Sequence, residues 1–280
     1  MIINKDSLAA RINRISKEKG INANVLYSRY FFDCFLTRLA KSKYADKFIL
    51  KGGLYLSSIL GIENRFTMDI DFLIQKIKME HDNIVLIVKE ICNKSLDDNV
   101  NFKYIGDSKI KKDDIYGGFS IVLEGNLENV RQRFDIDLAT GDVIYPKECN
   151  YEYDCIITSE TINLKSYPVE SIIAEKIQTF LVKGVLNSRS KDFYDLYILE
   201  KMYFNNNNIN GIKKAFYMTC KNRNCKMNKD EACDIVESVK ANIIQQNRWD
   251  SYSKSTKYAS GILFDDVLEA IRRLVNALFL

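Results

Sequence analysis

Residues 65–74 read RFTMDIDFLI, a short strand pattern on which the prediction of the fold depends. Alternation along it puts Asp69 and Asp71 on one face of the strand, about 7 Å apart at their Cα atoms. Two carboxylates on one face repel each other unless a cation lies between them. Mg²⁺ prefers carboxylate and phosphate oxygens, so the pair indicates a metal site. For an isolated pair, a solvated acidic strand face is the alternative.

A glycine turn precedes this strand. Phe48–Leu50 is a short apolar segment that leads into Lys51-Gly52-Gly53, and Leu54–Leu60 predicts a helix that Gly61 ends. The N-terminus of a helix offers N–H groups to a phosphate, and glycines let a ligand approach the backbone closely. A glycine pair before a helix is common in tight turns. Together with an acid pair less than twenty residues later, it favours a nucleotide-phosphate site.

A second acidic strand is predicted at 130–138, where Asp135 and Asp137 again share one face. If it lies beside the first strand, one of the two is a third metal-facing carboxylate. The alternative is that both acids neutralise Arg131 and Arg133 in surface pairs.

The helix predicted over 169–183 carries Lys176 inside its apolar stripe. A buried lysine needs a charged partner, and triphosphate oxygens would supply one. The alternatives are that Lys176 reaches solvent from the edge of the stripe or pairs with a structural acid such as Asp192. Asp192 and Asp195 share one face of the next predicted helix, where acids also complement the helix dipole.

Spacing along the chain predicts an α/β domain over residues 1–165, with a mixed sheet covered by helices, and a helical domain over residues 166–280. Helical periodicity runs through residues 6–43 and 84–92. The predicted strands are 67–74, 100–105, 116–124 and 130–138, with turns at 106–108 and 124–126. The predicted helices of the second domain are 169–183, 191–203, 209–221, 229–246 and 262–279.

Composition limits the class of protein. The N-terminus is charged and no apolar run approaches the roughly 18 residues that a membrane span needs, so we expect a cytoplasmic protein. The seven cysteines lack paired spacing, which favours reduced thiols over disulfides or zinc. The net charge of +4 comes from the second half of the chain, as expected for a polyanionic partner or for a solvated helix face.

The blocks FILKGG, NRFTMDIDFLI, RFDIDLATGD, AEKIQTFLVKG and SRSKDFYDLYIL, in this order between about residues 48 and 200, resemble the abortive-infection toxin nucleotidyltransferases of the AbiEii/AbiGii type. The resemblance implies a polymerase-β-like nucleotidyltransferase domain with a helical C-terminal domain. It also implies a Mg²⁺-dependent (or Mn²⁺-dependent) transferase that uses a nucleoside triphosphate. Its acceptor would be RNA, in some members the tRNA 3′ end. The family belongs to type IV toxin–antitoxin systems, so toxicity, phage defence and a winged-helix repressor as antitoxin are expected.

The resemblance also assigns roles to residues. It makes Asp69 and Asp71 the metal pair, with Asp137 or Asp135 as third ligand. The family's later motifs are matched by Lys176, Asp192 and Asp195, which are therefore predicted to be catalytic. The resemblance does not decide which of the two acids is essential. The predicted phosphate-binding residues are Lys51, Gly52, Gly53, Arg65, Thr67 and Lys176. The turn has Gly-Gly where the wider superfamily has Gly-Ser, and Thr67 partly replaces the missing hydroxyl.

Two other functions share these motifs. A nucleotidyltransferase that modifies a small molecule, such as an antibiotic, would keep the metal site and use an acidic substrate pocket. A catalytically silent module would bind the triphosphate without turnover. A metal-dependent nuclease is a weaker alternative, because it has no need of a phosphate-binding glycine turn. Basic residues of the second half, with Tyr217 among them, would suit an RNA acceptor, which basic and aromatic side chains bind; a solvated helix surface is the alternative.

Overall fold

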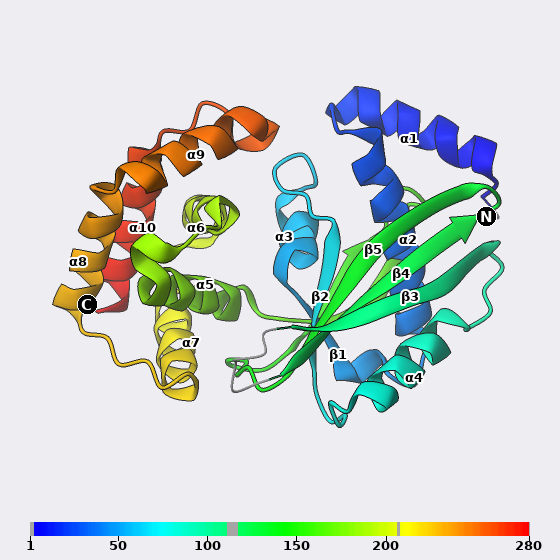
Figure 1. Ribbon diagram of the computed structural model, residues 1–280, viewed down its shortest axis with the longest axis horizontal. Coiled ribbons are helices and arrows are strands. Elements are labelled where there is room, and N and C mark those ends of the chain that lie inside the picture. The colour runs from blue at the N-terminus through cyan, green and yellow to red at the C-terminus, as the bar shows by residue number, and fades with distance from the viewer. Residues whose placement is uncertain (1–2, 111–116, 206–207, 280) are drawn as a thin grey trace. The chain divides into compact units, whose positions relative to one another are not determined.

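The protein is described from a computed structural model, which covers residues 3–110, 117–205 and 208–279 (Figure 1). Its chain forms two compact units, one of Met1–Asp142 with Cys149–Ser166 and one of Val143–Glu148 with Tyr167–Leu280. The segment 143–148 is held in the second unit by Ser171, whose hydroxyl accepts the N–H of Tyr145 at 2.9 Å. The predicted domain bounds, 1–165 and 166–280, stay a prediction.

The first unit is built on a seven-stranded mixed sheet, in the order β3-β4-β5-β2-β1-β7-β6. β2 pairs in parallel with β5 and β1 in parallel with β7, while the other neighbours are antiparallel. The predicted α/β fold with a mixed sheet is thereby confirmed. The strands are β1 Phe48–Lys51, β2 Asp69–Ile74, β3 Val100–Ile110, β4 Gly118–Leu127, β5 Val130–Ala139, β6 Cys149–Asp154 and β7 Thr161–Ser166.

Helices pack on this sheet because each presents an apolar face to it. The helices of the first unit are α1 Lys5–Lys19, α2 Ala23–Ala40, α3 Gly52–Leu60 and α4 His81–Cys92, with a 3₁₀ turn, η1, at Ala45–Lys47. The central helix α2 contacts β5, β7, α1 and α4, and it buries Phe31, Phe32 and Phe35 completely. Helix α3 contacts β1 and β2, so the helix that begins at the glycine turn lies against the strand that carries the acid pair.

Several sequence-based elements of this unit were wrong in extent. Residues 106–108 and 124–126 were predicted as turns, but they lie inside β3 and β4. At Gly106 the ladder only shifts register, and at Gly125 a Cβ atom would lie 2.3 Å from the Phe31 ring. These glycines therefore accommodate a bulge and a close packing contact rather than a turn. β1, β6 and β7 were not predicted as strands. Residue 116 of the strand predicted at 116–124 lies outside the described residues.

The second unit is helical, as predicted. Its elements are α5 Val169–Lys183, η2 Gly184–Leu186, α6 Ser190–Tyr203, α7 Ile209–Asn222, α8 Lys229–Lys240, α9 Ile243–Ser255, η3 Lys257–Ala259 and α10 Phe264–Leu278. α10 packs on α6, α7 and α8, and α5 packs on α6 and α7. The single helix predicted at 229–246 is wrong, because Asn242 breaks it. Its side chain accepts the N–H groups of Ile244 and Gln245 and so caps the new helix α9.

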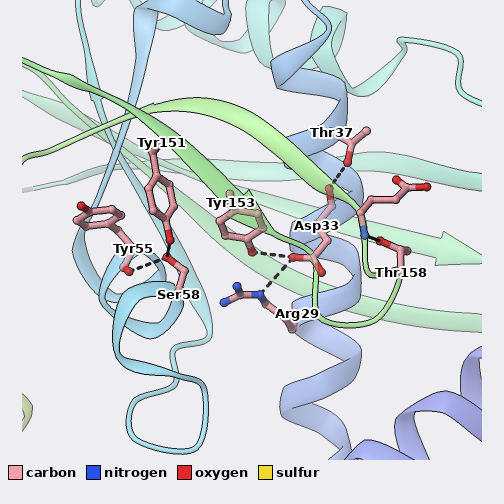
Figure 2. A network of polar contacts seen from close by, with 9 residues as sticks. Arg29, Asp33, Thr37, Tyr55, Ser58, Tyr151, Tyr153 and Thr158 are labelled. Atoms are coloured by element: carbon pink, nitrogen blue, oxygen red, sulfur yellow. Dashed lines mark hydrogen bonds and ion pairs between the residues drawn. The ribbon is translucent and has the colours of Figure 1, made fainter.

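A buried polar network joins α2 and β6, and a second contact joins β6 and α3 (Figure 2). Asp33 accepts a hydrogen bond from the Tyr153 hydroxyl at 2.6 Å and from Arg29 Nε at 3.2 Å. Two residues away on the same strand, the Tyr151 hydroxyl bonds Ser58 at 2.8 Å. The helix that follows the glycine turn is thus tied through β6 to the layer that α2 forms.

Among the described residues, no helix is long and apolar enough to cross a membrane.

Candidate active site

Two neighbouring strands bring the acidic residues together, and a third adds a lysine. Because β2 and β5 are parallel neighbours, Asp69 lies beside Asp135 and Asp71 beside Asp137. On the other side of β2, Lys51 at the end of β1 is the register partner of Asp71. Asp69, Asp71 and Asp137 are partly buried, whereas Asp135 is exposed. Asp137 is therefore the acid of β5 beside Asp71, and which of Asp135 and Asp137 is the third metal ligand stays a prediction.

The glycine turn packs closely against this acidic centre. Gly52 has φ +63°, in the left-handed region, and an added Cβ atom would lie 2.1 Å from Asp71 Oδ2. At Gly53 an added Cβ atom would lie 2.7 Å from Thr67 Oγ1. Both distances are well below van der Waals contact. Glycine is thus required at both positions by the approach of the turn to β2 and to the segment that precedes it.

Protein donors hold the two central carboxylates. Gly53 donates its N–H to Asp71 Oδ2 at 3.1 Å, so Asp71 caps the N-terminus of α3. The Thr67 hydroxyl donates to Asp69 Oδ1. The sequence assigned these donors to a phosphate, and in the structure they bind the carboxylates. The two contacts set the side-chain orientations of both acids.

The electrostatics of Asp71 record a surplus of negative charge. Burial, the largest cause, and the negative charges of Asp69 and Asp137 together raise the pKa of Asp71 to about 6, while the Gly53 N–H and the Lys51 ammonium act against them. An acidic cluster of this kind is stabilised by added positive charge.

The donor set fits Mg²⁺, a hard cation that takes carboxylate oxygens. Among the described residues, however, no three His, Cys, Asp or Glu side chains already converge as a finished metal site. The reason lies in the local contacts, since Asp71 is turned to Gly53 and Asp69 to Thr67. Small side-chain rotations would be needed for the three carboxylates to share one ion, while the backbone already sets them side by side.

The remaining residues predicted for phosphate binding in this unit lie around the same turn. Arg65 is 3% exposed, donates to the Phe66 carbonyl, and would lie 3.3 Å from a Cβ atom at Gly53. Lys51 Nζ lies 2.7 Å from Asp142 Oδ2. Asp142 was not among the predicted site residues. Its signal in the sequence was its place directly after the Thr140-Gly141 turn that follows the second acidic strand.

The second unit holds the other predicted catalytic residues in one cluster. Lys176 Nζ lies 3.0 Å from Asp192 Oδ1 and 2.8 Å from Asp195 Oδ2. The side chain of Asp195 is fully buried, and those of Lys176 and Asp192 are 16% and 12% exposed. The motif lysine thus has two protein partners, one of them the acid that the sequence named as the alternative to phosphate. The catalytic roles of all three residues stay predictions.

A mixed sheet that carries an acid pair beside a glycine turn, with a helical unit after it, defines a nucleotidyltransferase. The chain belongs to the family of AbiEii nucleotidyl transferase toxins of type IV toxin–antitoxin systems, whose sequence model matches residues 34–270. The family predicted from the motifs is therefore confirmed, and so is the enzyme class. The match includes every residue predicted for the site.

Two solved structures from Helicobacter pylori share the fold. A protein described as a candidate nucleotidyltransferase is 16% identical, with a TM-score of 0.53 over 92% of this chain and 96% of its own. The second, JHP933, is 15% identical, with a TM-score of 0.51 over 92% of this chain and 93% of its own. At this identity the likeness concerns the fold alone. No curated protein matches the chain.

Proposed function

We propose that this chain is a Mg²⁺-dependent toxin that transfers a nucleotide from a nucleoside triphosphate to an RNA acceptor, the 3′ end of tRNA. One observation carries the proposal: Asp69, Asp71 and Asp137 lie side by side on β2 and β5, directly against a glycine turn that opens a helix. Such an arrangement offers negative ligands to a cation and N–H donors to a phosphate at the same place.

The reaction that fits is an in-line displacement at the α-phosphorus. An acceptor hydroxyl forms the new P–O bond, the bond to the bridging oxygen breaks, and pyrophosphate leaves with the bonding electron pair. The hydroxyl proton passes to a carboxylate of the site. Mg²⁺, held by Asp69, Asp71 and Asp137, would offset the charge of the triphosphate. The protein's own contribution is to position and to neutralise, which is most of what phosphoryl transfer requires.

Surface charge of the second unit supports the RNA acceptor. On α7, Lys214, Tyr217 and Lys221 are exposed at a spacing that places them on one helix face. Tyr217 is 66% exposed, as a side chain that stacks on an unpaired base must be. Arg223, by contrast, bonds Gln178 and Glu175 within the unit. The family further implies an antitoxin partner, by resemblance a winged-helix repressor, and a role in phage defence.

The test is incubation of the purified protein with each α-³²P-labelled nucleoside triphosphate, Mg²⁺ and total tRNA, read on a denaturing gel. We expect label in the tRNA band for the wild type and none for Asp69→Asn. Asp154→Asn, which changes an acid on the edge strand β6, is the matched control and keeps the activity. Label in a small-molecule acceptor instead of tRNA would overturn the proposed acceptor. Triphosphate binding without any product would identify a silent module.

A further inference from the structure

Lys51 stands in the acidic centre with a partner that the proposed reaction does not use. It is the last residue of β1 and the N-cap residue of α3, and it faces Asp71 across the ladder. Its ammonium forms an ion pair with Asp142 at 2.7 Å, and both side chains are only 15% exposed. A lysine head group is mobile on its four-carbon stem unless a partner fixes it. Here the partner is a carboxylate in a largely buried pair.

Asp142 reaches this place through a specific turn. β5 ends at Ala139, and Gly141 adopts φ +86°, a left-handed conformation that favours glycine. The turn brings the chain from Asp137 back to the end of β1, so Asp142 and Lys51 meet at the same edge as the three carboxylates. The strand that supplies the third acid therefore also supplies the partner of Lys51.

The ion pair places the Lys51 ammonium on the side of the acidic centre. The Lys51 charge is close enough to Asp71 to act on it. An ammonium group has three donors, so one lysine can bond Asp142 and other acceptors at the same time. An ordered cation beside the metal-binding acids is where the phosphates of a bound nucleotide need one.

We propose that Asp142 is a positioning residue for nucleotide binding, which holds the Lys51 ammonium beside Asp71 where it donates to triphosphate oxygens. The inference rests on the proposed function, since it assumes that a triphosphate binds at this centre. Asp142 touches neither the phosphate nor the acceptor in this role. Its effect on the nucleotide passes through Lys51.

The experiment measures the affinity of the full-length protein for Mg²⁺–ATP, or for the nucleotide that the labelling assay selects, together with KM and kcat of transfer. For Asp142→Asn we expect Kd and KM for the nucleotide to rise about tenfold, the loss of one well-placed charged hydrogen bond, with kcat almost unchanged. Asp142→Glu, which keeps the charge, recovers most of the affinity. In a Lys51→Met background, Asp142→Asn has no further effect.

The control breaks a different ion pair of the same unit. Asp98 Oδ2 lies 2.6 Å from Arg38 Nη1, and this ion pair is away from the acidic centre. Asp98→Asn should therefore lower the melting temperature and leave Kd for the nucleotide unchanged. An equal loss of affinity in the Lys51→Met background would overturn the inference, as would unchanged or tighter binding by Asp142→Asn. If the wild type binds the nucleotide but transfers nothing, the proposed reaction fails while Kd still tests the positioning. If it binds no nucleotide, both fail.

Discussion

Replacing Gly52 with alanine should separate the function of the glycine turn from its effect on stability. The new Cβ atom would lie 2.1 Å from Asp71 Oδ2 and 2.7 Å from Asp71 Cβ, so rotation of the carboxylate alone cannot relieve the contact. Moving the oxygen out to 3.0 Å requires a shift of 0.9 Å, which is 3.0 minus 2.1. A misplacement of about 1 Å at a reacting centre costs on the order of 100-fold in rate. We therefore expect Gly52→Ala to lower nucleotide transfer to tRNA about 100-fold.

A matched control is available at Gly261, which has φ +81° and no heavy atom within 4 Å of the position that a Cβ atom would take. Gly261→Ala carries the same left-handed strain, about 1–2 kcal/mol, without the collision. Both variants should lose a similar amount of stability in thermal unfolding from the strain, while Gly52→Ala alone loses transfer. Transfer by Gly52→Ala within about threefold of that by Gly261→Ala would refute the reasoning that the turn positions Asp71.

Three further outcomes test the rest of the site. Mg²⁺ at ten times its Kd should stabilise the wild type by about 1.4 kcal/mol in thermal unfolding; Asp137→Asn should lose this effect and Asp135→Asn keep it, and the reverse result would make Asp135 the ligand. Asp195→Asn should cost about 2 kcal/mol in chemical denaturation and Asp192→Asn about 1 kcal/mol, because Asp195 is the more buried partner of the lysine; equal losses would contradict this. Lys221→Gln should lower the slope of log affinity for tRNA against log salt by about 0.7–1, and an unchanged slope would remove α7 from the RNA surface.

The local patterns of the sequence were sufficient for the acid pair and the glycine turn. Alternation along residues 69–74 follows from the period of a strand, and Gly-Gly before an apolar helical run follows from backbone freedom. Both are properties of a few consecutive residues. The choice between Asp135 and Asp137 was different in kind, because it depends on which strand β5 pairs with and in which register. Two acids at i and i+2 look alike until that pairing is known.

Glycines in the middle of strands were misread for a similar reason. Glu124-Gly125-Asn126 has the composition of a turn, yet Gly125 lies in β4 because the ring of Phe31, a residue far away in the sequence, fills the space of its missing side chain. A close approach between distant segments leaves no local trace except the glycine itself. The break at Asn242 was missed because asparagine inside a helical pattern signals a cap only when the chain changes direction there.

Charged residues four apart show the limit of sequence reasoning most clearly. Arg29 and Asp33 have the spacing of an ordinary pair on a helix surface, but they are 3% and 2% exposed. Burial raises the pKa of Asp33 to about 6 against the influence of Arg29, so the pair is costly to bury. What offsets the cost is the Tyr153 hydroxyl from β6, a strand that the sequence did not predict.

The same dependence on distant partners explains how the acidic centre is organised. Asp71 satisfies an N–H group at the start of α3, a donor that would otherwise have no partner within the helix. The carboxylate and the positive end of the helix therefore stabilise each other, which offsets part of the repulsion from Asp69 and Asp137. Because Gly52 has no side chain, Asp71 can approach the turn closely enough to form this hydrogen bond. Asp71 is therefore held both by its strand, β2, and by the glycine turn. The glycine turn thus determines the position of the carboxylate, and the turn and Asp71 cannot move independently of each other.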